Sequence, residues 1–275
     1  MRASFVTVLA LVLFAGFLSC VSRSLTDQRF SESRSLNGPS NSVTVADPND
    51  FSFSFVGDMH IAGADVRYLN LILDDSAARG DAFHVSLGDI VDEGDEGDFN
   101  AFYNAVVAKG WMGKVFTAIG NHDVFYDGWN YYKQHWGASH YAFTVGNTKF
   151  IVFDTADGNV GEGQMAWIES ELDSSTATNT IFVSHYMPLV PGIQTYLRLA
   201  NREEALSLMR LATQRGVKAW IGGHYHSYIS EVVDGVQYVV AGGGGGRRMP
   251  PVNEYFYVQA QVSGASISFA RRTIE

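Results

Sequence analysis

Five short clusters of histidine, aspartate and asparagine contain the side chains best suited to bind metal ions and to transfer protons. The clusters are Asp58 with His60, Asp89 with Asp92, Asn121 with His122 and Asp123, His185 alone, and His224 with His226. Imidazole and carboxylate groups suit zinc, manganese and iron, and an aspartate between two ions can share its oxygens with both. Five of the eight histidines lie in these clusters, so a shared metal centre explains them better than separate structural roles.

Each cluster follows an apolar run of strand length. The predicted strands are Phe51–Val56, Ala82–Leu87, Val115–Ile119, Phe150–Phe153, Thr180–Val183 and Ala219–Ile221. In open α/β sheets, ligands bind just beyond the carboxyl ends of the strands. We therefore expect the loops that carry the clusters to converge on one site.

Helix-length amphipathic stretches separate these strands, as in α/β architecture. The stretches Ala64–Ala78 and Glu203–Gln214 each place their apolar side chains on one helical face. Turn signals at Gly146-Asn147 and Asp234-Gly235 predict two hairpins, and an alternating pattern continues towards the end of the chain. The sequence predicts an α/β fold in which two sheets pack together between helical layers, as one domain over residues 49–275.

Composition limits the classes of function. Of the 275 residues, 46% are hydrophobic and 17% are charged, which suits one globular domain after removal of a leader. The formal net charge of -10 argues against general nucleic-acid binding, because such proteins usually carry a basic patch. An acidic chain that meets phosphate needs local positive charge, and bound metal ions could supply it.

The start of the chain differs in composition from the rest. Met1 and Arg2 precede an apolar run from Val6 to Leu18, which is typical of an export signal over residues 1–20. A spanning helix needs about 20 apolar residues, although a buried helix or a membrane anchor is the alternative. Residues 21–48 are polar and predict a flexible tether. We therefore expect an exported protein in the periplasm or at the cell surface.

Cys20 is the only cysteine, so no disulfide can form within the mature chain. The stretch Phe17-Leu18-Ser19-Cys20 resembles a bacterial lipoprotein signal, in which the cysteine is lipidated, although Phe17 and Leu18 depart from the usual small residues. A lipid on Cys20 would be the predicted link to a membrane. The alternative is a simple secretory signal with an incidental cysteine.

Taken in order, the clusters resemble the motifs of the calcineurin-like metallophosphoesterases. The matching motifs are Asp58-Met-His60, Gly88-Asp89-Ile-Val-Asp92, Gly120-Asn121-His122-Asp123, His185 and Gly223-His224-Tyr-His226. The resemblance implies a four-layer sandwich of two mixed β-sheets flanked by helices. It also implies two transition-metal ions, of manganese, iron or zinc, that hold a hydroxide for attack on phosphate mono- or diesters.

The resemblance assigns a role to each of these residues. Asp58, His60 and His226 would bind the first ion, Asn121, His185 and His224 the second, and Asp89 would bridge the two. His122 would protonate the leaving oxygen, and Asp92 matches the position that pairs with this histidine. Purple acid phosphatases, a related branch, have a tyrosine ligand where this chain has Asp92, so we expect no iron–tyrosinate colour. Asp123 could orient the same loop.

Other candidate residues have a simpler structural interpretation. The run Gly242–Gly246 lacks the ending of a P-loop and is interpreted as a turn beside the site, with Arg247 as a phosphate contact. His84 is expected in the core, and His135 and His140 are expected at surface or packing positions. For the aromatic residues after His122, stacking on a substrate base and packing of a helix remain equally open. These residues are Tyr126, Trp129, Tyr131 and Tyr132.

Two classes of function remain. The first is a phosphoesterase whose substrate could be a nucleotide, with an open site because no insertion covers it. The second is a non-catalytic surface protein that keeps the same site to bind a metal or a ligand. Every expected ligand position is filled, which favours the enzyme.

Overall fold

The computed structural model describes residues 24–39, 43–188 and 198–274. The predicted export signal over residues 1–20 and the predicted lipid site at Cys20 lie outside the described residues. Within the ranges that the structure describes, no helix is both long enough and apolar enough to cross a membrane.

The first sheet has five strands in the order β11-β10-β1-β2-β3. These strands are β1 (Asp50–Val56), β2 (His84–Ser86), β3 (Val115–Thr117), β10 (Phe256–Ser263) and β11 (Ser266–Thr273). The strands β1, β2 and β3 are parallel, and β10 pairs antiparallel with β1 and β11. The loops after the three parallel strands therefore leave the sheet at the same edge.

The second sheet has six strands in the order β4-β5-β6-β7-β9-β8. They are β4 (Tyr141–Val145), β5 (Thr148–Val152), β6 (Asn179–Val183), β7 (Ala219–Gly222), β8 (Tyr228–Val233) and β9 (Val236–Ala241). The four central strands are parallel, and β4 and β8 are antiparallel edges. The hairpins predicted at Gly146-Asn147 and Asp234-Gly235 join β4 to β5 and β8 to β9, so both predictions are confirmed.

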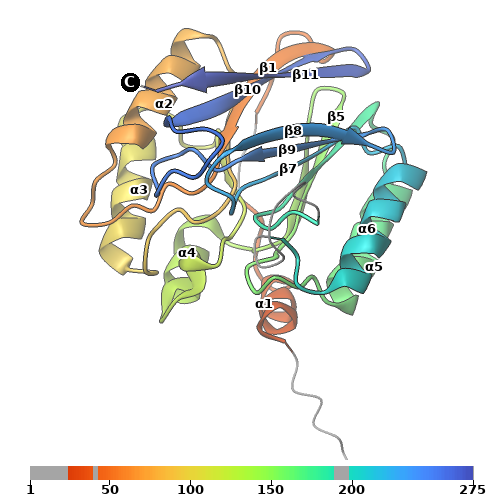
Figure 1. Cartoon of the computed structure of the whole chain (residues 1–275), viewed down its shortest axis with the longest axis horizontal. Helices are drawn as coiled ribbons and strands as arrows, with labels where there is room; N and C mark the ends of the chain where they lie inside the picture. Colours follow the sequence, from red (N-terminus) through yellow and green to blue (C-terminus); the bar gives the residue numbers. More distant parts are fainter. Residues whose placement is uncertain (1–23, 40–42, 189–197, 275) are drawn as a thin grey trace, which may run out of the picture.

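Helices cover the outer face of each sheet (Figure 1). On the side of the first sheet lie α2 (Arg67–Ala78), α3 (Glu96–Ala108) and α4 (Gly128–Trp136), and the 3-10 helix η1 (His122–Val124) precedes α4. On the side of the second sheet lie α5 (Glu162–Asp173) and α6 (Arg202–Gln214). The predicted helices Ala64–Ala78 and Glu203–Gln214 correspond to α2 and α6.

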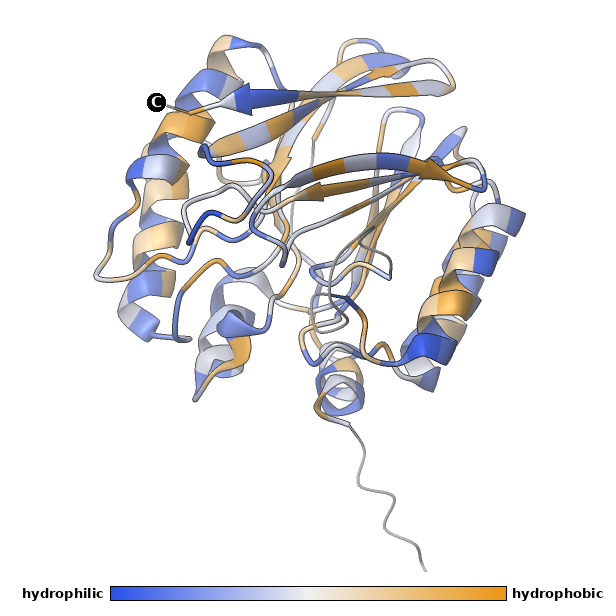
Figure 2. Ribbon diagram, viewed as in Figure 1, coloured by the Kyte–Doolittle hydropathy of each residue, from blue (hydrophilic) through white to orange (hydrophobic). Residues whose placement is uncertain are grey.

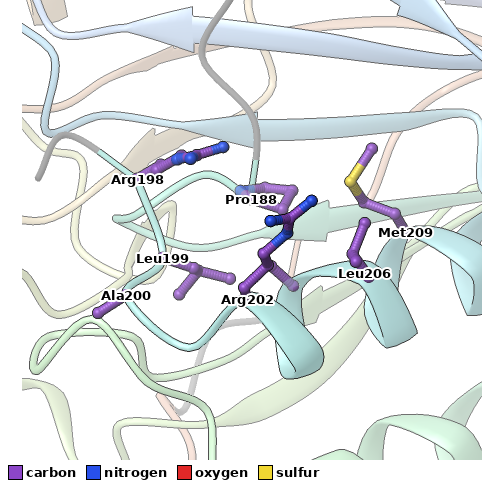
Figure 3. Close-up of a pocket in the computed structure, with 8 residues that line it drawn as sticks. Pro188, Arg198, Leu199, Ala200, Arg202, Leu206 and Met209 are labelled. Atoms are coloured by element: carbon purple, nitrogen blue, oxygen red, sulfur yellow. The ribbon is translucent and has the colours of Figure 1, made fainter. Parts of the chain in front are cut away.

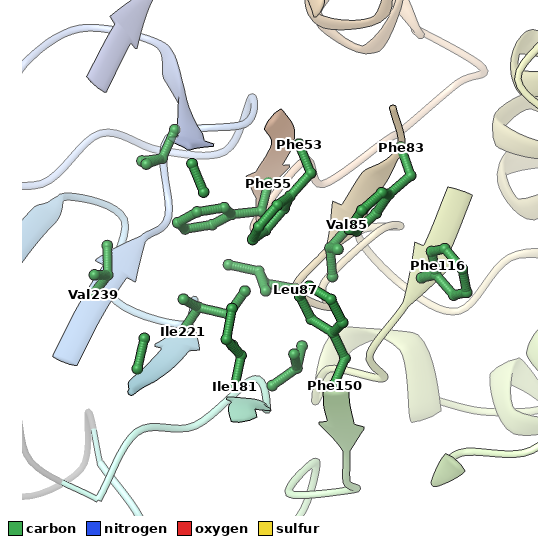
Figure 4. Packing of buried hydrophobic residues seen from close by; sticks show 14 of the residues in the cluster. Phe53, Phe55, Phe83, Val85, Leu87, Phe116, Phe150, Ile181, Ile221 and Val239 are labelled. Carbon is green, nitrogen blue, oxygen red and sulfur yellow. The ribbon is translucent and has the colours of Figure 1, made fainter. Parts of the chain in front are cut away.

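Three apolar clusters hold these layers together. The central cluster lies between the two sheets, where Phe53 and Phe83 of the first sheet meet Phe150 and Ile181 of the second (Figure 4). A second cluster joins the first sheet to α2, α3 and α4, and a third joins the second sheet to α5 and α6. Figure 2 shows the apolar residues concentrated on the strands and along one side of the helices. The predicted fold class, two mixed sheets flanked by helices, is confirmed.

The predicted strands agree with the structure except at their ends. The range Ala82–Leu87 is regular strand only from His84 to Ser86, although Ala82 and Leu87 still donate to Ser52 and Val56 of β1. At the end of each of these strands the chain turns into a functional loop. The regular hydrogen bonding of the strand therefore stops before the apolar run ends.

The described part of residues 21–48 differs from the flexible tether predicted for it. Leu25–Ser33 forms helix α1, which begins after Ser24, whose hydroxyl accepts a hydrogen bond from the backbone N–H of Asp27. The buried guanidinium of Arg29 donates to both carboxylate oxygens of Asp154, over 2.7 and 3.1 Å. The helix therefore docks on the domain through polar contacts, and this segment is not a tether over its described length.

Candidate metal centre

All five predicted clusters meet at the carboxyl ends of strands from both sheets. Asp58 and His60 follow β1, Asp89 and Asp92 follow β2, and Asn121 to Asp123 follow β3 in the first sheet. His185 follows β6, and His224 with His226 follow β7 in the second sheet. Among the described residues, potential ligand atoms within 4.8 Å of one another form three groups. The groups are Asp58 with His60, Asp89 and His226; Asp89 with His185 and His224; and His60 with Asp92 and His122.

The first group surrounds one point between the two sheets. The Nε2 atom of His226 lies 3.3 Å from Oδ1 of Asp58 and 3.2 Å from Nε2 of His60. The same nitrogen of His60 lies 3.6 Å from Oδ2 of Asp89. These nitrogen and oxygen atoms converge closely enough to surround a single cation.

The second group shares Asp89 with the first. The Nε2 atom of His185 lies 3.2 Å from Oδ2 of Asp89 and 3.1 Å from Oδ1 of Asn121. The ring of His224 lies 5.2 Å from the ring of His185. Oδ2 of Asp89 therefore lies within 3.6 Å of a ring nitrogen in each group, and its bridging of two ions stays a prediction.

Three of the histidines have fixed ring orientations. The Nδ1 atom of His60 contacts Oδ1 of Asp92 at 2.8 Å, that of His185 the carbonyl oxygen of Leu87 at 2.8 Å, and that of His226 the carbonyl oxygen of Arg247 at 2.7 Å. Such contacts to the second ring nitrogen are typical of metal-binding histidines, because they select the tautomer whose free Nε2 can bind the ion. The donor set therefore fits a transition metal.

Two buried carboxylates concentrate negative charge at the centre. Asp58 and Asp89 are at most 1% exposed. Burial opposes ionisation, yet His226 lowers the pKa of Asp58 and His185 lowers the pKa of Asp89. Burial likewise opposes charge on His185, but Asp89 raises its pKa to about 9. A cation would replace the protons on these rings, since histidine binds metal in its neutral form.

The backbone at the centre is unusual. Asp58, His60, Asp89 and His224 all have φ angles between 47° and 65°, a region that residues other than glycine seldom adopt. Such conformations cost about 1–3 kcal/mol each and occur where the surrounding structure enforces them, often at functional sites. Gly120 contributes to this enforcement, because a Cβ atom there would lie 2.2 Å from the backbone nitrogen of Asp89.

The carboxylate of Asp92 lies closer to His60 than to His122, the residue with which the resemblance pairs it. Its Oδ1 atom lies 2.8 Å from Nδ1 of His60 but 3.8 Å from Nδ1 of His122. The ring of His122 instead contacts the backbone carbonyl of Asp92, over 2.6 Å. The side chain of Asp92 therefore orients His60, and its backbone carbonyl contacts His122.

His122 lies at the edge of the centre. Its side chain is 30% exposed, and its ring lies 4.4 Å from that of His60. Its backbone N–H donates to Oδ1 of Asp89 over 2.8 Å. A partly exposed imidazole beside the ligand groups can exchange a proton with a bound substrate.

Asp123 links two of the functional loops. Its carboxylate accepts hydrogen bonds from the N–H groups of Ile90, Val91 and Gly120, over 2.8 to 3.1 Å. Burial and the nearby charge of Asp89 raise its pKa to about 7. These contacts agree with the loop-orienting role expected from the sequence.

The remaining histidines have structural surroundings. His84 is fully buried, contacts the hydroxyl of Ser54, and has its pKa lowered to about 3 by burial. His135 contacts the side chain of Asn100, and His140 packs between Phe30 and Trp167. The expectation that these three residues lie outside the centre is confirmed.

The glycine run Gly242–Gly246 forms a turn against the centre. The N–H groups of Gly244 and Gly246 donate to the backbone carbonyls of Gly57 and Asp58, over 3.0 and 2.8 Å. The carbonyl of Arg247 orients His226, as described above, while its own side chain is exposed. The loop is thus a structural turn beside the site, and contact of Arg247 with phosphate stays a prediction.

The four aromatic residues after His122 divide between packing and exposure. Tyr132 is fully buried and hydrogen-bonded to Thr117, while Trp129 and Tyr131 pack against the core of the first sheet and its helices. Tyr126 is 87% exposed. Helix packing therefore explains three of the four.

Two aromatic contacts at the centre were missed from the sequence. The ring of Tyr186 stacks on that of His224 at 3.7 Å, and the ring of Phe125 lies 4.7 Å from that of His122. Each residue stands in the chain within three positions of a predicted site histidine. Proximity in the chain was the available signal, but it does not indicate which way a ring points.

A cavity of about 530 Å³ lies at a different place, near the start of α6 (Figure 3). Pro188, Arg198, Arg202 and Met209 are among the described residues that line it, and none of the predicted ligands does. We assign the chemistry to the loops at the strand ends, because the candidate ligands gather there.

Comparisons with known proteins agree with the predicted family and with the fold. The sequence model of the calcineurin-like phosphoesterases matches residues 51–228, which is more than half of the chain. Among curated proteins, the comparison found no significant match.

Solved structures share the fold at low identity. The purple acid phosphatase PPD1 of yellow lupin (Lupinus luteus) has a TM-score of 0.66 and 17% identity, over 86% of this chain and 52% of its own. GAP50, the anchor in the inner membrane complex of Plasmodium, has a TM-score of 0.63 and 16% identity, over 82% and 89%. A dimetal phosphatase from Danio rerio has a TM-score of 0.60 and 15% identity, over 82% and 99%. The chain thus spans about half the length of the lupin enzyme.

Proposed function

Because this chain belongs to the calcineurin-like phosphoesterase family, we propose that it hydrolyses phosphate mono- or diesters at a centre for two transition-metal ions. Manganese, iron and zinc all suit the candidate ligands, which are imidazole nitrogens and carboxylate or amide oxygens. The same proposal covers the substrate of the whole protein, which is a phosphate ester and for which a nucleotide is one candidate.

The position of Asp89 is the observation that supports two ions most directly. Its Oδ2 atom lies 3.6 Å from the Nε2 atom of His60 and 3.2 Å from that of His185, and these rings belong to different ligand groups. A single carboxylate oxygen between two sets of nitrogens can bind both ions. Asp58, His60 and His226 would hold the first, and Asn121, His185 and His224 the second.

The bound ions would polarise the phosphoryl group and activate a water molecule as nucleophile. The protein's own residues orient the substrate and move protons. His122 stands beside the first group, partly exposed, with Nδ1 held by the carbonyl of Asp92. Its Nε2 would then donate a proton to the leaving oxygen, and the exposed Arg247 would contact phosphate. General acid catalysis of this kind contributes about 10²- to 10⁴-fold.

Protein anchoring is the second candidate function. GAP50 shares the fold and is described as an anchor, so the same architecture also occurs in a protein named for assembly. In this chain the described loops retain candidate ligands for both groups and a histidine beside them. That retention favours the enzyme.

We also propose that the chain is exported, with residues 1–20 removed. The supporting observation is the apolar run after Arg2. Mass spectrometry of the mature protein would test the cleavage and would reveal a lipid on Cys20. A mature chain that still begins at Met1 would contradict export through this segment.

The activity is tested with the full chain as it is expressed, loaded with manganese, zinc or iron. Hydrolysis of p-nitrophenyl phosphate and of its diester analogue is compared among wild type, Asp89→Asn and His122→Ala. We expect Asp89→Asn to lose bound metal and activity, whereas His122→Ala should keep its metal and lose activity only partly with these nitrophenyl esters, whose leaving group is stable as an anion. If folded wild type contained two ions but hydrolysed neither ester, the proposal would be wrong. A non-catalytic protein that binds a ligand or partner would then be favoured.

A further inference from the structure

We propose that Phe125 contacts the leaving group of the substrate and makes the centre selective for phosphate esters whose leaving group carries a flat aromatic ring. The inference rests on the proposed phosphoesterase activity, in which His122 protonates the leaving oxygen. It starts from an exposed aromatic ring that lies beside this histidine.

A continuous series of ring contacts connects Phe125 to the candidate ligands. The ring of Phe125 lies 4.7 Å from that of His122, at an angle of 49°. The ring of His122 lies 4.4 Å from that of His60, which in turn lies 4.8 Å from that of His226. Phe125 is therefore linked to the ligand groups through the ring of His122. The leaving group must occupy the neighbourhood of His122 in order to receive its proton.

The ring of Phe125 is available for contact. It is 41% exposed, and it belongs to none of the three core clusters of the described residues. A single exposed apolar side chain is common on protein surfaces and by itself has no functional meaning. Here the exposed ring lies against the proposed proton donor, so a bound leaving group would cover it.

The turn that carries Phe125 is fixed by its neighbours. The carbonyl oxygen of Phe125 accepts a hydrogen bond from the N–H of Gly128, over 2.9 Å. The same oxygen packs against Gly94, where a Cβ atom would lie only 2.2 Å away and where φ is +66°. A ring held on such a turn is arranged before substrate binds, so little conformational entropy is lost on contact.

The reaction places the leaving group where Phe125 can reach it. The oxygen of water bonds to phosphorus, and the bond from phosphorus to the ester oxygen breaks. That oxygen takes the proton of His122, the attacking water releases a proton to solvent, and His122 is reprotonated from solvent. A flat ring attached to the departing oxygen can stack on Phe125, whereas a small alkyl group cannot.

The test compares two substrates and two variants of the metal-loaded full chain. The substrates are 1-naphthyl phosphate and glycerol 2-phosphate, whose kcat/KM ratio cancels their different intrinsic reactivities when variants are compared. We expect Phe125→Ala to lower this ratio about tenfold, as removal of a stacking partner does elsewhere. Met112→Ala is the matched control, because Met112 is 44% exposed and lies before β3, at the end opposite the site.

Binding measurements separate this inference from the proposed activity. Calorimetry with benzylphosphonate and ethylphosphonate gives an affinity ratio that needs no turnover, and we expect the same tenfold decrease in Phe125→Ala. Metal content should be unchanged. Phe125→Leu keeps an apolar side chain but has no flat ring. It should therefore also lower the kcat/KM ratio and the affinity ratio.

Each outcome is decisive. Equal losses for aromatic and alkyl compounds, or unchanged ratios in Phe125→Ala, would overturn the inference and leave the phosphoesterase proposal intact. If metal-loaded wild type hydrolysed neither substrate, the proposed function would fail. The phosphonate ratio would then still show whether Phe125 selects aromatic groups.

Discussion

Asp92 lies 2.8 Å from the Nδ1 atom of His60, which makes this carboxylate the partner of a candidate metal ligand. The other nitrogen of His60 faces the first ligand group, close to His226 and Asp89. Asp92 can thus make His60 a stronger ligand by accepting its proton at Nδ1. The closest contact of the same residue with His122 is made by its backbone carbonyl, over 2.6 Å.

We expect Asp92→Asn to weaken metal binding at the first group about 10- to 100-fold, as loss of a carboxylate behind a ligating histidine does. Competition with a metal indicator would measure the affinity of each ion. Asp65→Asn is the control, because Asp65 is exposed, pairs with Arg67 and belongs to none of the three ligand groups of the described residues. Unchanged affinity together with a large decrease in kcat would instead assign the Asp92 side chain to His122.

We expect His122→Ala to lower kcat about 10²- to 10⁴-fold for esters of alkyl alcohols, because these leaving groups need a proton. The decrease should be much smaller for p-nitrophenyl phosphate, whose leaving group is stable as an anion. Steady-state rates with both substrates would show the difference, and bound metal should remain at the wild-type amount. His135→Ala provides a control histidine near the surface. Equal decreases for both substrates would argue against proton donation.

Metal affinity should increase with pH up to about pH 9. The pKa of His185 is raised to about 9 in the metal-free protein, so a metal ion must displace a proton at lower pH. Calorimetric titration with manganese in buffers of different ionisation enthalpy would count the released protons. Binding without proton release at pH 7 would contradict the involvement of His185.

The same pKa predicts how the stability of the metal-free protein depends on pH. A histidine whose pKa is raised from 6.5 to about 9 on folding stabilises the folded state fully below pH 6.5, and the stabilisation is lost as pH rises to 9. One pKa unit corresponds to about 1.4 kcal/mol, so we expect a decrease of about 1–3 kcal/mol. Urea unfolding at several pH values, with His185→Gln as reference, would measure it. If the free energy of unfolding of the metal-free wild type did not change between pH 6.5 and 9, this prediction would be wrong.

Arg29→Met should destabilise the protein by about 3–5 kcal/mol, because it leaves the buried carboxylate of Asp154 without its partner. Thermal unfolding would report the loss. Arg34 lies at the end of the same helix and is exposed, so Arg34→Met should have little effect on stability. Equal stability of both variants would show that docking of α1 contributes nothing to the fold.

The sequence predicted those elements whose apolar residues face a core. The runs ending at Val56, Val183 and Ile221 form largely buried strands, in which apolar side chains predominate although serines alternate with phenylalanines in β1. The functional residues could be found since each follows such a run, so strand order placed them at one edge. Helix α1 escaped prediction because the side chains it buries are Thr26, Arg29 and Ser33, which no apolar periodicity reveals.

The finer geometry of the site depends on backbone angles that the sequence does not display. His60 and Asp89 adopt left-handed conformations that decide which neighbour each side chain meets. The family resemblance paired Asp92 with His122, whereas the carboxylate of Asp92 lies closer to His60. The backbone turn that carries Phe125 depends similarly on the close approach of its carbonyl to Gly94.

The candidate centre draws its ligands from both sheets, with Asp58 after β1 and His226 after β7. An ion held there would act as a cross-link between two layers that otherwise adhere through apolar contact. Ligand binding and folding are then thermodynamically linked, since an ion that binds only the folded state adds to its stability. This linkage is reciprocal. A substitution deep between the sheets, such as Phe53→Leu, would therefore weaken the affinity for metal although it changes none of the candidate metal ligands. Tolerance of the core to mutation would accordingly depend on how much metal the surroundings supply.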